Sequence, residues 1–108
     1  MNPDLPLTET IYYILLVLHR PLHGYGIAKE VEELTARRVT LGAGTLYGAI
    51  KNLSKKGWIR VYKDEEDARR KKEYILTDEG RRVFDEEQKR LKKMLEDAKK
   101  VRESYEKV

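Results

Sequence analysis

Lysine, asparagine and tyrosine side chains recur at helical spacing between residues 44 and 55. At 100° per residue, an apolar face of this segment is formed by Leu46, Ala49, Ile50 and Leu53. The opposite face and its flanks carry Gly44, Tyr47, Gly48, Lys51, Asn52 and Lys55. Lysine can neutralise phosphates or reach guanine edges, and asparagine can pair with adenine. The pattern therefore predicts a helix that lies in the major groove of DNA.

The charge and the glycine content of this segment favour the same interpretation. No acidic residue occurs between Gly42 and Tyr62, in a chain that has 19 Asp and Glu residues. Gly48 costs about 1 kcal/mol of helix propensity relative to alanine, and a missing side chain would permit close approach of the backbone to DNA. Thr45, Tyr47 and the amides at the helix start could bind phosphates. The alternative is an ordinary solvated amphipathic helix, and the helix alone leaves the two interpretations about equally supported.

A predicted β-hairpin follows this helix and supports the DNA-binding interpretation. Its strands span residues 58–63 and 73–76, and an almost purely charged tip joins them. The tip has an acidic half, residues 64–67, and a basic half made of Arg69, Arg70, Lys71 and Lys72. In a winged helix such a hairpin straddles the DNA backbone or enters the minor groove, where arginine is favoured. The alternative is a self-paired, charge-balanced loop that keeps the sheet edge soluble.

The remaining elements are predicted from hydrophobic periodicity and turn residues. Helices are expected from Thr8 to Leu18, from Tyr25 to Leu34, from Thr45 to Lys56 and from residue 78 to about Tyr105. Turns are expected at Pro21, Gly24 and Gly26, at residues 42–45, which offer an N-cap, and at Gly57, a C′ glycine. The predicted fold is mainly α with a small β-hairpin: a winged helix-turn-helix plus a long C-terminal helix. We divide it into a DNA-binding domain, 1–77, and a dimerisation helix, 78–108.

The last helix carries two series of residues spaced by seven. Phe84, Leu91, Ala98 and Tyr105 form one series; the other is Glu87, Met94, Val101 and Val108, with Leu95 widening the stripe. Only Glu87 interrupts the apolar seam. A helix of this length exceeds what one small domain can cover, so the pattern predicts a homodimer that binds a pseudo-palindromic site. The alternative, packing against its own domain, is expected only for the first two turns, around Val83 and Phe84.

The composition narrows the function classes. The 108 residues fit one small domain, and 39% of them are charged, with a net charge of +4. The absence of cysteine excludes disulfides, thiolate metal sites and cysteine catalysis. His19 and His23 have Pro21 between them and no third ligand, and no catalytic constellation stands out, so neither a metal, a cofactor nor an enzyme is expected. The longest apolar run, Ile11 to Leu18, is too short to span a bilayer, and without a signal peptide the protein is expected in the cytoplasm.

Four motifs together resemble the PadR family of transcriptional regulators, over about residues 5 to 105. They are residues 23–27 (HGYGI), 44–53 (GTLYGAIKNL), 56–59 (KGWI) and 74–80 (YILTDEG). The length is similar to that of the shorter subfamily, which has one C-terminal dimerisation helix. The resemblance implies that Tyr25, Thr45, Tyr47, Lys51 and Asn52 face DNA. Many members have proline where this chain has Gly48.

The resemblance also implies a dimeric repressor of genes for detoxification, efflux or stress response, released by a small phenolic or drug-like effector. Drug-binding members of the subfamily hold ligands with a planar aromatic residue from the C-terminal helix, where this chain has Leu91. The candidate ligand-binding residues here are Tyr12, Tyr13, Phe84, Leu91 and Met94.

A winged-helix module that binds proteins instead of DNA is the main rival, because the fold alone does not prove nucleic-acid binding. The stretch without acidic residues from Gly42 to Tyr62 distinguishes the two functions and favours DNA binding, since a protein-binding face has no reason to lack acidic residues.

Overall fold

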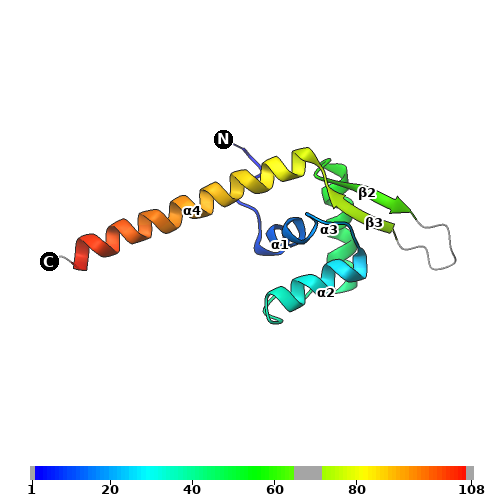
Figure 1. The fold of residues 1–108 in the computed structure, drawn as a ribbon, viewed down its shortest axis with the longest axis horizontal. Helices are drawn as coiled ribbons and strands as arrows, with labels where there is room; N and C mark the ends of the chain where they lie inside the picture. The colour runs from blue at the N-terminus through cyan, green and yellow to red at the C-terminus, as the bar shows by residue number, and fades with distance from the viewer. Residues whose placement is uncertain (1, 65–71, 107–108) are drawn as a thin grey trace.

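The computed structural model describes residues 2–64 and 72–106, and confirms the mainly helical winged-helix fold with a long C-terminal helix. The helices are α1 (Glu9–Val17), α2 (Gly24–Leu34), α3 (Ala43–Lys55) and α4 (Asp78–Glu106). The strands are β1 (Leu22–His23), β2 (Ile59–Asp64) and β3 (Lys72–Leu76). Figure 1 shows α1, α2 and α3 gathered on one end of α4, while the other half of α4 projects away from them.

The sheet has three strands, one more than the predicted hairpin. All pairs are antiparallel in the order β1-β3-β2, and Leu22 pairs with Tyr74. A strand of two residues leaves no periodicity to read in a sequence, which is why β1 was not predicted. The prediction that Gly24 and Gly26 form a turn after Pro21 is wrong, because both glycines lie in the first turn of α2.

One apolar core joins the helices to the sheet. Its buried members come from α1, α2, α3, both long strands and the first turns of α4, and include Ile14, Leu15, Ile27, Val31, Leu53, Ile59 and Val83. Trp58 is buried there too. The apolar stripe of α3 is confirmed, since Leu46, Ile50 and Leu53 are each at most 5% exposed. This stripe fixes the rotation of α3, so its opposite face must point outward.

The turn between α2 and α3 is held by Thr35. Its hydroxyl donates to the carbonyl of Val31 at 2.8 Å and accepts from the amide of Val39 at 3.1 Å. Ala36 and Arg37 follow with φ angles of 50° and 65°, a left-handed pair that reverses the chain. Val39 then enters the core. The start of α3 differs from the prediction: Gly42 is the N-cap and makes no side-chain hydrogen bond, so Thr45 lies inside the helix.

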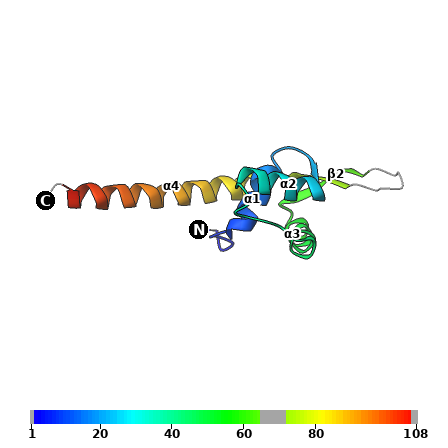
Figure 2. The ribbon, with the colours of Figure 1, turned by 90° about the horizontal axis from the view of Figure 1, so that it is seen from below.

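A close contact between α4 and Trp58, the residue directly before β2, sets where the last helix begins. The hydroxyl of Thr77 accepts from the amide of Gly80 at 3.0 Å, which caps α4 near its expected start. A Cβ added at Gly80 would lie 2.0 Å from the carbonyl oxygen of Trp58. Only glycine therefore permits α4 to lie this close to the backbone of Trp58. Figure 2 shows α4 passing along the other helices and continuing beyond them.

Replacing Gly80 with alanine should destabilise the protein, because either α4 or the Trp58 backbone must move. We expect a loss of about 1–3 kcal/mol, the usual cost of overpacking. The matched control is Gly48→Ala in the middle of α3, where an added Cβ meets nothing within 4 Å. That change should stabilise by about 1 kcal/mol through helix propensity. Urea unfolding at one fixed protein concentration measures both, and equal effects of the two substitutions would contradict the close contact.

Candidate nucleic-acid interface

The outward face of α3 presents the residues that the sequence predicted there. Gly44, Thr45, Tyr47, Gly48, Lys51, Asn52 and Lys55 are all exposed. A side chain added at Gly44 or Gly48 would meet no atom within 4 Å. The outer surface of α3 is therefore flat along its first two turns and carries cations and an amide further along. This chemistry suits a phosphate-lined groove.

The N-terminus of α2 lies against this face through Tyr47. The hydroxyl of Tyr47 lies 2.6 Å from where a Cβ of Gly24 would be, so any other residue at position 24 would displace the tyrosine ring. Tyr47 is nonetheless 54% exposed, and Tyr25, in the same turn as Gly24, is 70% exposed. Two exposed tyrosines from different helices thus lie beside the basic face of α3.

His23 has a role that the sequence did not reveal. Its Nδ1 accepts a hydrogen bond from the amide of Gly26 at 3.2 Å, and this makes it the N-cap of α2. Its ring also stacks on Tyr25, with centroids 6.2 Å apart and 12° between the planes. Histidine is an uncommon cap, and the standard cap residues are Ser, Thr, Asp and Asn. The signal that could have found it is its position directly before a glycine-rich helix start.

The wing is described only near its base. Arg69, Arg70 and Lys71 lie outside the described residues, while Lys72 begins β3 and is exposed. In β2 the register shifts between Val61 and Lys63, leaving Tyr62 as the extra residue of a β-bulge. Tyr62 is 52% exposed. Bulges bend a strand and redirect a side chain, so Tyr62 is an exposed aromatic at the wing base that the sequence analysis missed.

Three of the five candidate ligand residues come together between α1 and α4. Tyr12 stacks on Phe84 with centroids 4.9 Å apart, and Tyr13 packs edge-on against Tyr12 at 5.6 Å. Leu91 is half-buried and Met94 is exposed, further along α4. Phe84 itself is only 3% exposed. In a single chain the aromatic group is therefore packed against itself, with Leu91 and Met94 extending the surface outward.

The second half of α4 carries an exposed apolar stripe. Six residues on one face of α4 form what we call the α4 stripe: Leu91, Met94, Leu95, Ala98, Val101 and Tyr105. Apart from half-buried Leu91 they are all exposed, and Leu95 and Tyr105 each expose more than 70% of their surface. Val83 and Phe84, in the first turns, are buried as expected. Large apolar side chains exposed in a row are typical of an interaction surface.

Glu87 interrupts the predicted seam because it binds the N-terminal arm, which consists of residues 2–7 before the N-cap of α1. Its carboxylate accepts the amide of Leu7 at 2.8 Å and pairs with Arg90 through two nitrogens, at 2.5 and 3.0 Å. The residue is 1% exposed. The hydrogen bond from Arg90, with that from Leu7, holds the pKa of Glu87 below its usual range, although burial opposes this.

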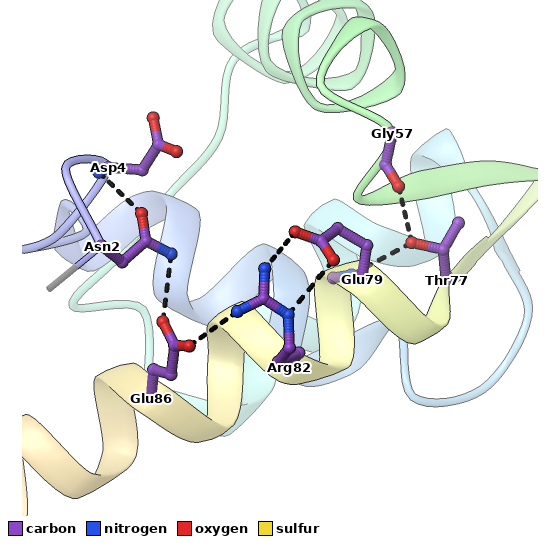
Figure 3. Close-up of polar contacts among 8 residues, drawn as sticks. Asn2, Asp4, Gly57, Thr77, Glu79, Arg82 and Glu86 are labelled. Carbon is purple, nitrogen blue, oxygen red and sulfur yellow. Dashed lines mark hydrogen bonds and ion pairs between the residues drawn. The ribbon is translucent and has the colours of Figure 1, made fainter.

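Further polar contacts tie the arm to the start of α4 (Figure 3). Asn2 donates to Glu86 at 3.1 Å, and Arg82 lies between Glu86 and Glu79. On its other side the arm reaches α3, where Asp4 pairs with Lys56 at 3.0 Å. The arm therefore touches both the helix that carries the basic face and the helix that carries the α4 stripe.

Within residues 2–64 and 72–106, no cluster of three His, Cys, Asp or Glu side chains could hold a metal. Among the same residues no helix is long and apolar enough to cross a membrane.

The sequence model of the transcriptional regulator PadR-like family matches residues 14–86, which are more than half of the chain. The chain belongs to this family. A PadR family transcription regulator from Clostridium difficile is 28% identical, with a TM-score of 0.72 over 87% of this chain and 98% of that one. PadR of Bacillus subtilis, solved in complex with operator DNA, is 27% identical, with a TM-score of 0.62 over 70% of this chain and 44% of that one.

A curated relative also matches: an uncharacterized 37.1 kDa protein in transposon TN4556 of Streptomyces fradiae. It is 37% identical over 67 residues, which are 62% of this chain and 18% of the relative, so this chain spans less than one fifth of that protein's length. The family match places this PadR-like chain among transcriptional regulators and not among enzymes. The resemblance seen in the four sequence motifs is confirmed.

The pair of buried Glu87 with half-buried Arg90 predicts a pH-dependent contribution to stability. Because the folded pKa of Glu87 lies below that of the unfolded carboxyl, about 4.3, the contribution is present above that pH and disappears as the pH falls through the folded pKa. Glu87→Gln should therefore cost about 1–3 kcal/mol at pH 7 and less at pH 3. Urea unfolding across this range measures it.

The control for this experiment is Glu86→Gln, since the pair of Glu86 with Arg82 is solvent-exposed. It should change stability by less than about 1 kcal/mol at either pH. If Glu87→Gln lowers the free energy of unfolding by the same amount at pH 7 and at pH 3, the charge of the carboxylate does not contribute to stability.

Proposed function

We propose that this PadR-like chain binds operator DNA as a homodimer and represses transcription. The observation that carries the proposal is the exposed face of α3, with Gly44, Gly48, Lys51, Asn52 and Lys55 and no carboxylate. A surface without acidic groups lowers the cost of approaching a polyanion. Relatedness to a PadR crystallised with operator DNA supports the same partner.

We propose a role in DNA binding for each of these residues. Lys51 and Asn52 reach base edges in the major groove, while Lys55 neutralises a phosphate. Thr45 and Tyr47 bind phosphates at the start of α3, and Gly44 and Gly48 let the backbone approach. Tyr25 adds a phosphate contact from α2. The wing residues Arg69, Arg70, Lys71 and Lys72 extend the contact to the neighbouring backbone or minor groove.

The dimer is proposed on the exposure of the α4 stripe. Burying Met94, Leu95, Val101 and Tyr105 in a second copy would remove from water apolar surface that one chain leaves exposed. A two-fold pair also presents two copies of α3 at a fixed spacing, which matches a pseudo-palindromic operator. We assign residues 1–77 to DNA reading and residues 78–108 to dimerisation.

The decisive test compares two lysines in operator binding. Duplexes selected from a random library by the protein would supply the site, and fluorescence anisotropy across a salt series would measure affinity. We expect two chains per duplex, a steep decrease of affinity with salt, and about a tenfold loss for Lys51→Ala. Lys89→Ala, an exposed lysine of α4, should leave affinity nearly unchanged.

Two outcomes would overturn this assignment. Equal losses for Lys51→Ala and Lys89→Ala would remove α3 as the reading helix. A selection that enriches no sequence would favour the protein-binding module instead.

The proposal includes release by a small aromatic effector at Tyr12, Tyr13, Phe84, Leu91 and Met94. The stack of Tyr12 on Phe84 supports it, since planar ligands bind where they can extend such a stack. Fluorescence titration with planar cationic dyes should show saturable binding that Tyr12→Ala weakens. Tyr62→Ala, at the wing base, is the matched control. Titrations that never saturate would remove the effector from the proposal.

A further inference from the structure

The two histidines of the chain use their Nδ1 atoms in opposite ways. In His19 this nitrogen donates to the carbonyl oxygen of Leu16 at 2.9 Å, so it carries a hydrogen. In His23 it accepts from the amide of Gly26 at 3.2 Å, so it carries none, and the hydrogen of the neutral ring is on Nε2. Protonation therefore leaves the contact of His19 intact, but it removes the lone pair that the contact of His23 needs.

His23 connects the start of α2 to an exposed aromatic ring of the proposed DNA interface. It precedes α2 in an extended conformation, with a φ of −79° and a ψ of 167°. A Cβ added at Gly26 would lie 3.7 Å from the Cε1 of His23, so the ring lies over the first turn of the helix. The same ring stacks on Tyr25, whose side chain is 70% exposed. The orientation of Tyr25 therefore depends on the ring that caps α2.

We propose that neutral His23 is a positioning residue for DNA binding, which holds Tyr25 toward the phosphate backbone, and that protonation of His23 weakens binding. The proposal rests on the DNA-binding function proposed above and adds a pH-dependent regulation of that interface. It follows from what a second ring proton does to the cap of α2, and from the groups that face the ring.

A proton on Nδ1 removes the acceptor that caps α2. The new N–H would point at the amide N–H of Gly26, and two donors cannot form a hydrogen bond. The positive charge would also lie at the positive end of the helix dipole, where residues 24–26 include no acidic side chain. A charged ring therefore leaves Gly26 and gives up the stack on Tyr25. Histidine ordinarily changes its charge between about pH 5 and pH 8, so this change falls near neutral pH.

The groups that face His23 favour a displaced position once the ring is charged. Glu73 of β3 pairs with His23, and Lys63 of β2 pairs with Glu73 on its other edge. Directly paired residues lie on the same side of a sheet, with their Cβ atoms about 5 Å apart. From α2 and α3 come Tyr25 and Tyr47, neither of which is charged near neutral pH. The carboxylate of Glu73 is therefore an acceptor within reach of the charged ring.

The same proton adds a positive charge near DNA, which by itself would strengthen binding. Glu73, directly opposite in the sheet, offsets this charge, whereas no acidic side chain of residues 24–26 replaces the lost cap of α2. Attraction between exposed charges is also weak in water, while the loss of an N-cap loosens the first turn of a helix. We therefore expect the affinity for DNA to fall as the pH falls.

Operator binding across a pH series tests the proposal, with the full chain and the duplex selected as described above. Fluorescence anisotropy at constant salt should show an affinity about three- to tenfold lower at about pH 5.5 than at about pH 7.5. His23→Asn keeps an oxygen acceptor at the cap and carries no titrating ring, so its affinity should change less than about twofold. His19→Asn, which removes the other histidine, is the matched control and should keep the full response.

Two further variants separate positioning from a merely structural role. Glu73→Gln removes the carboxylate that stabilises the charged ring, so the loss of affinity should shift to lower pH. Tyr25→Ala removes the ring through which His23 acts, so the response to pH should shrink to less than about twofold. In the free chain, the NMR signal of the Gly26 amide should shift with pH, and in His23→Asn it should stay constant.

Two results would overturn the role of His23 alone. One is an equal response to pH in the unmodified chain and in His23→Asn. The other is an affinity that rises as the pH falls and no longer does so in His23→Asn, since His23 would then bind phosphate as a cation. A chain that binds no duplex at any pH, although its Gly26 amide titrates, would instead overturn the proposed function and leave only the pH-dependent cap.

Discussion

The backbone of Trp58 is the point at which α3 and α4 are joined. Gly57, with a φ of 77°, ends α3 and turns the chain directly into Trp58, whose side chain is buried. The carbonyl of the same residue accepts the amide of Thr77 at 2.9 Å and lies against Gly80 at the start of α4. Because both contacts involve backbone atoms, there is little freedom to rotate one helix against the other. The angle between the basic face of α3 and the α4 stripe is therefore set within residues 57–80.

The N-terminal arm makes a second connection between the same helices. It binds the end of α3 through Asp4 and Lys56, and the third turn of α4 through Leu7 and Glu87. The two contacts differ in strength. The Asp4–Lys56 pair is more than 40% exposed on both sides and contributes little, whereas Glu87 is buried and fully hydrogen-bonded. The arm therefore mainly secures α4, and Glu87 marks where the helix stops packing on its own domain.

The sequence predicted those parts of the fold in which one periodicity extends over many residues. The faces of α3 and the length of α4 follow from apolar spacing alone, and the structure agrees with both. The features that the sequence could not show depend on contacts between segments far apart in the chain. Glu87 looked like a defect in a heptad seam because its partner, the amide of Leu7, lies 80 residues earlier. The capping role of His23 was not visible in the sequence because it depends on how α2 begins.

The two exposed surfaces of this chain differ in chemistry, and the difference decides what each can bind. The face of α3 combines glycine, lysine, asparagine and tyrosine, which offer hydrogen bonds and positive charge but little apolar area to bury. The α4 stripe has the opposite character, with leucine, methionine, valine and tyrosine exposed between charged flanks. Only the stripe gains free energy by pairing with an identical surface, since two copies of the basic face of α3 would repel each other. In the proposed dimer, self-association through α4 would leave both copies of α3 free, and the connection at Trp58 would carry the geometry of the helix pair to the surface proposed to meet DNA.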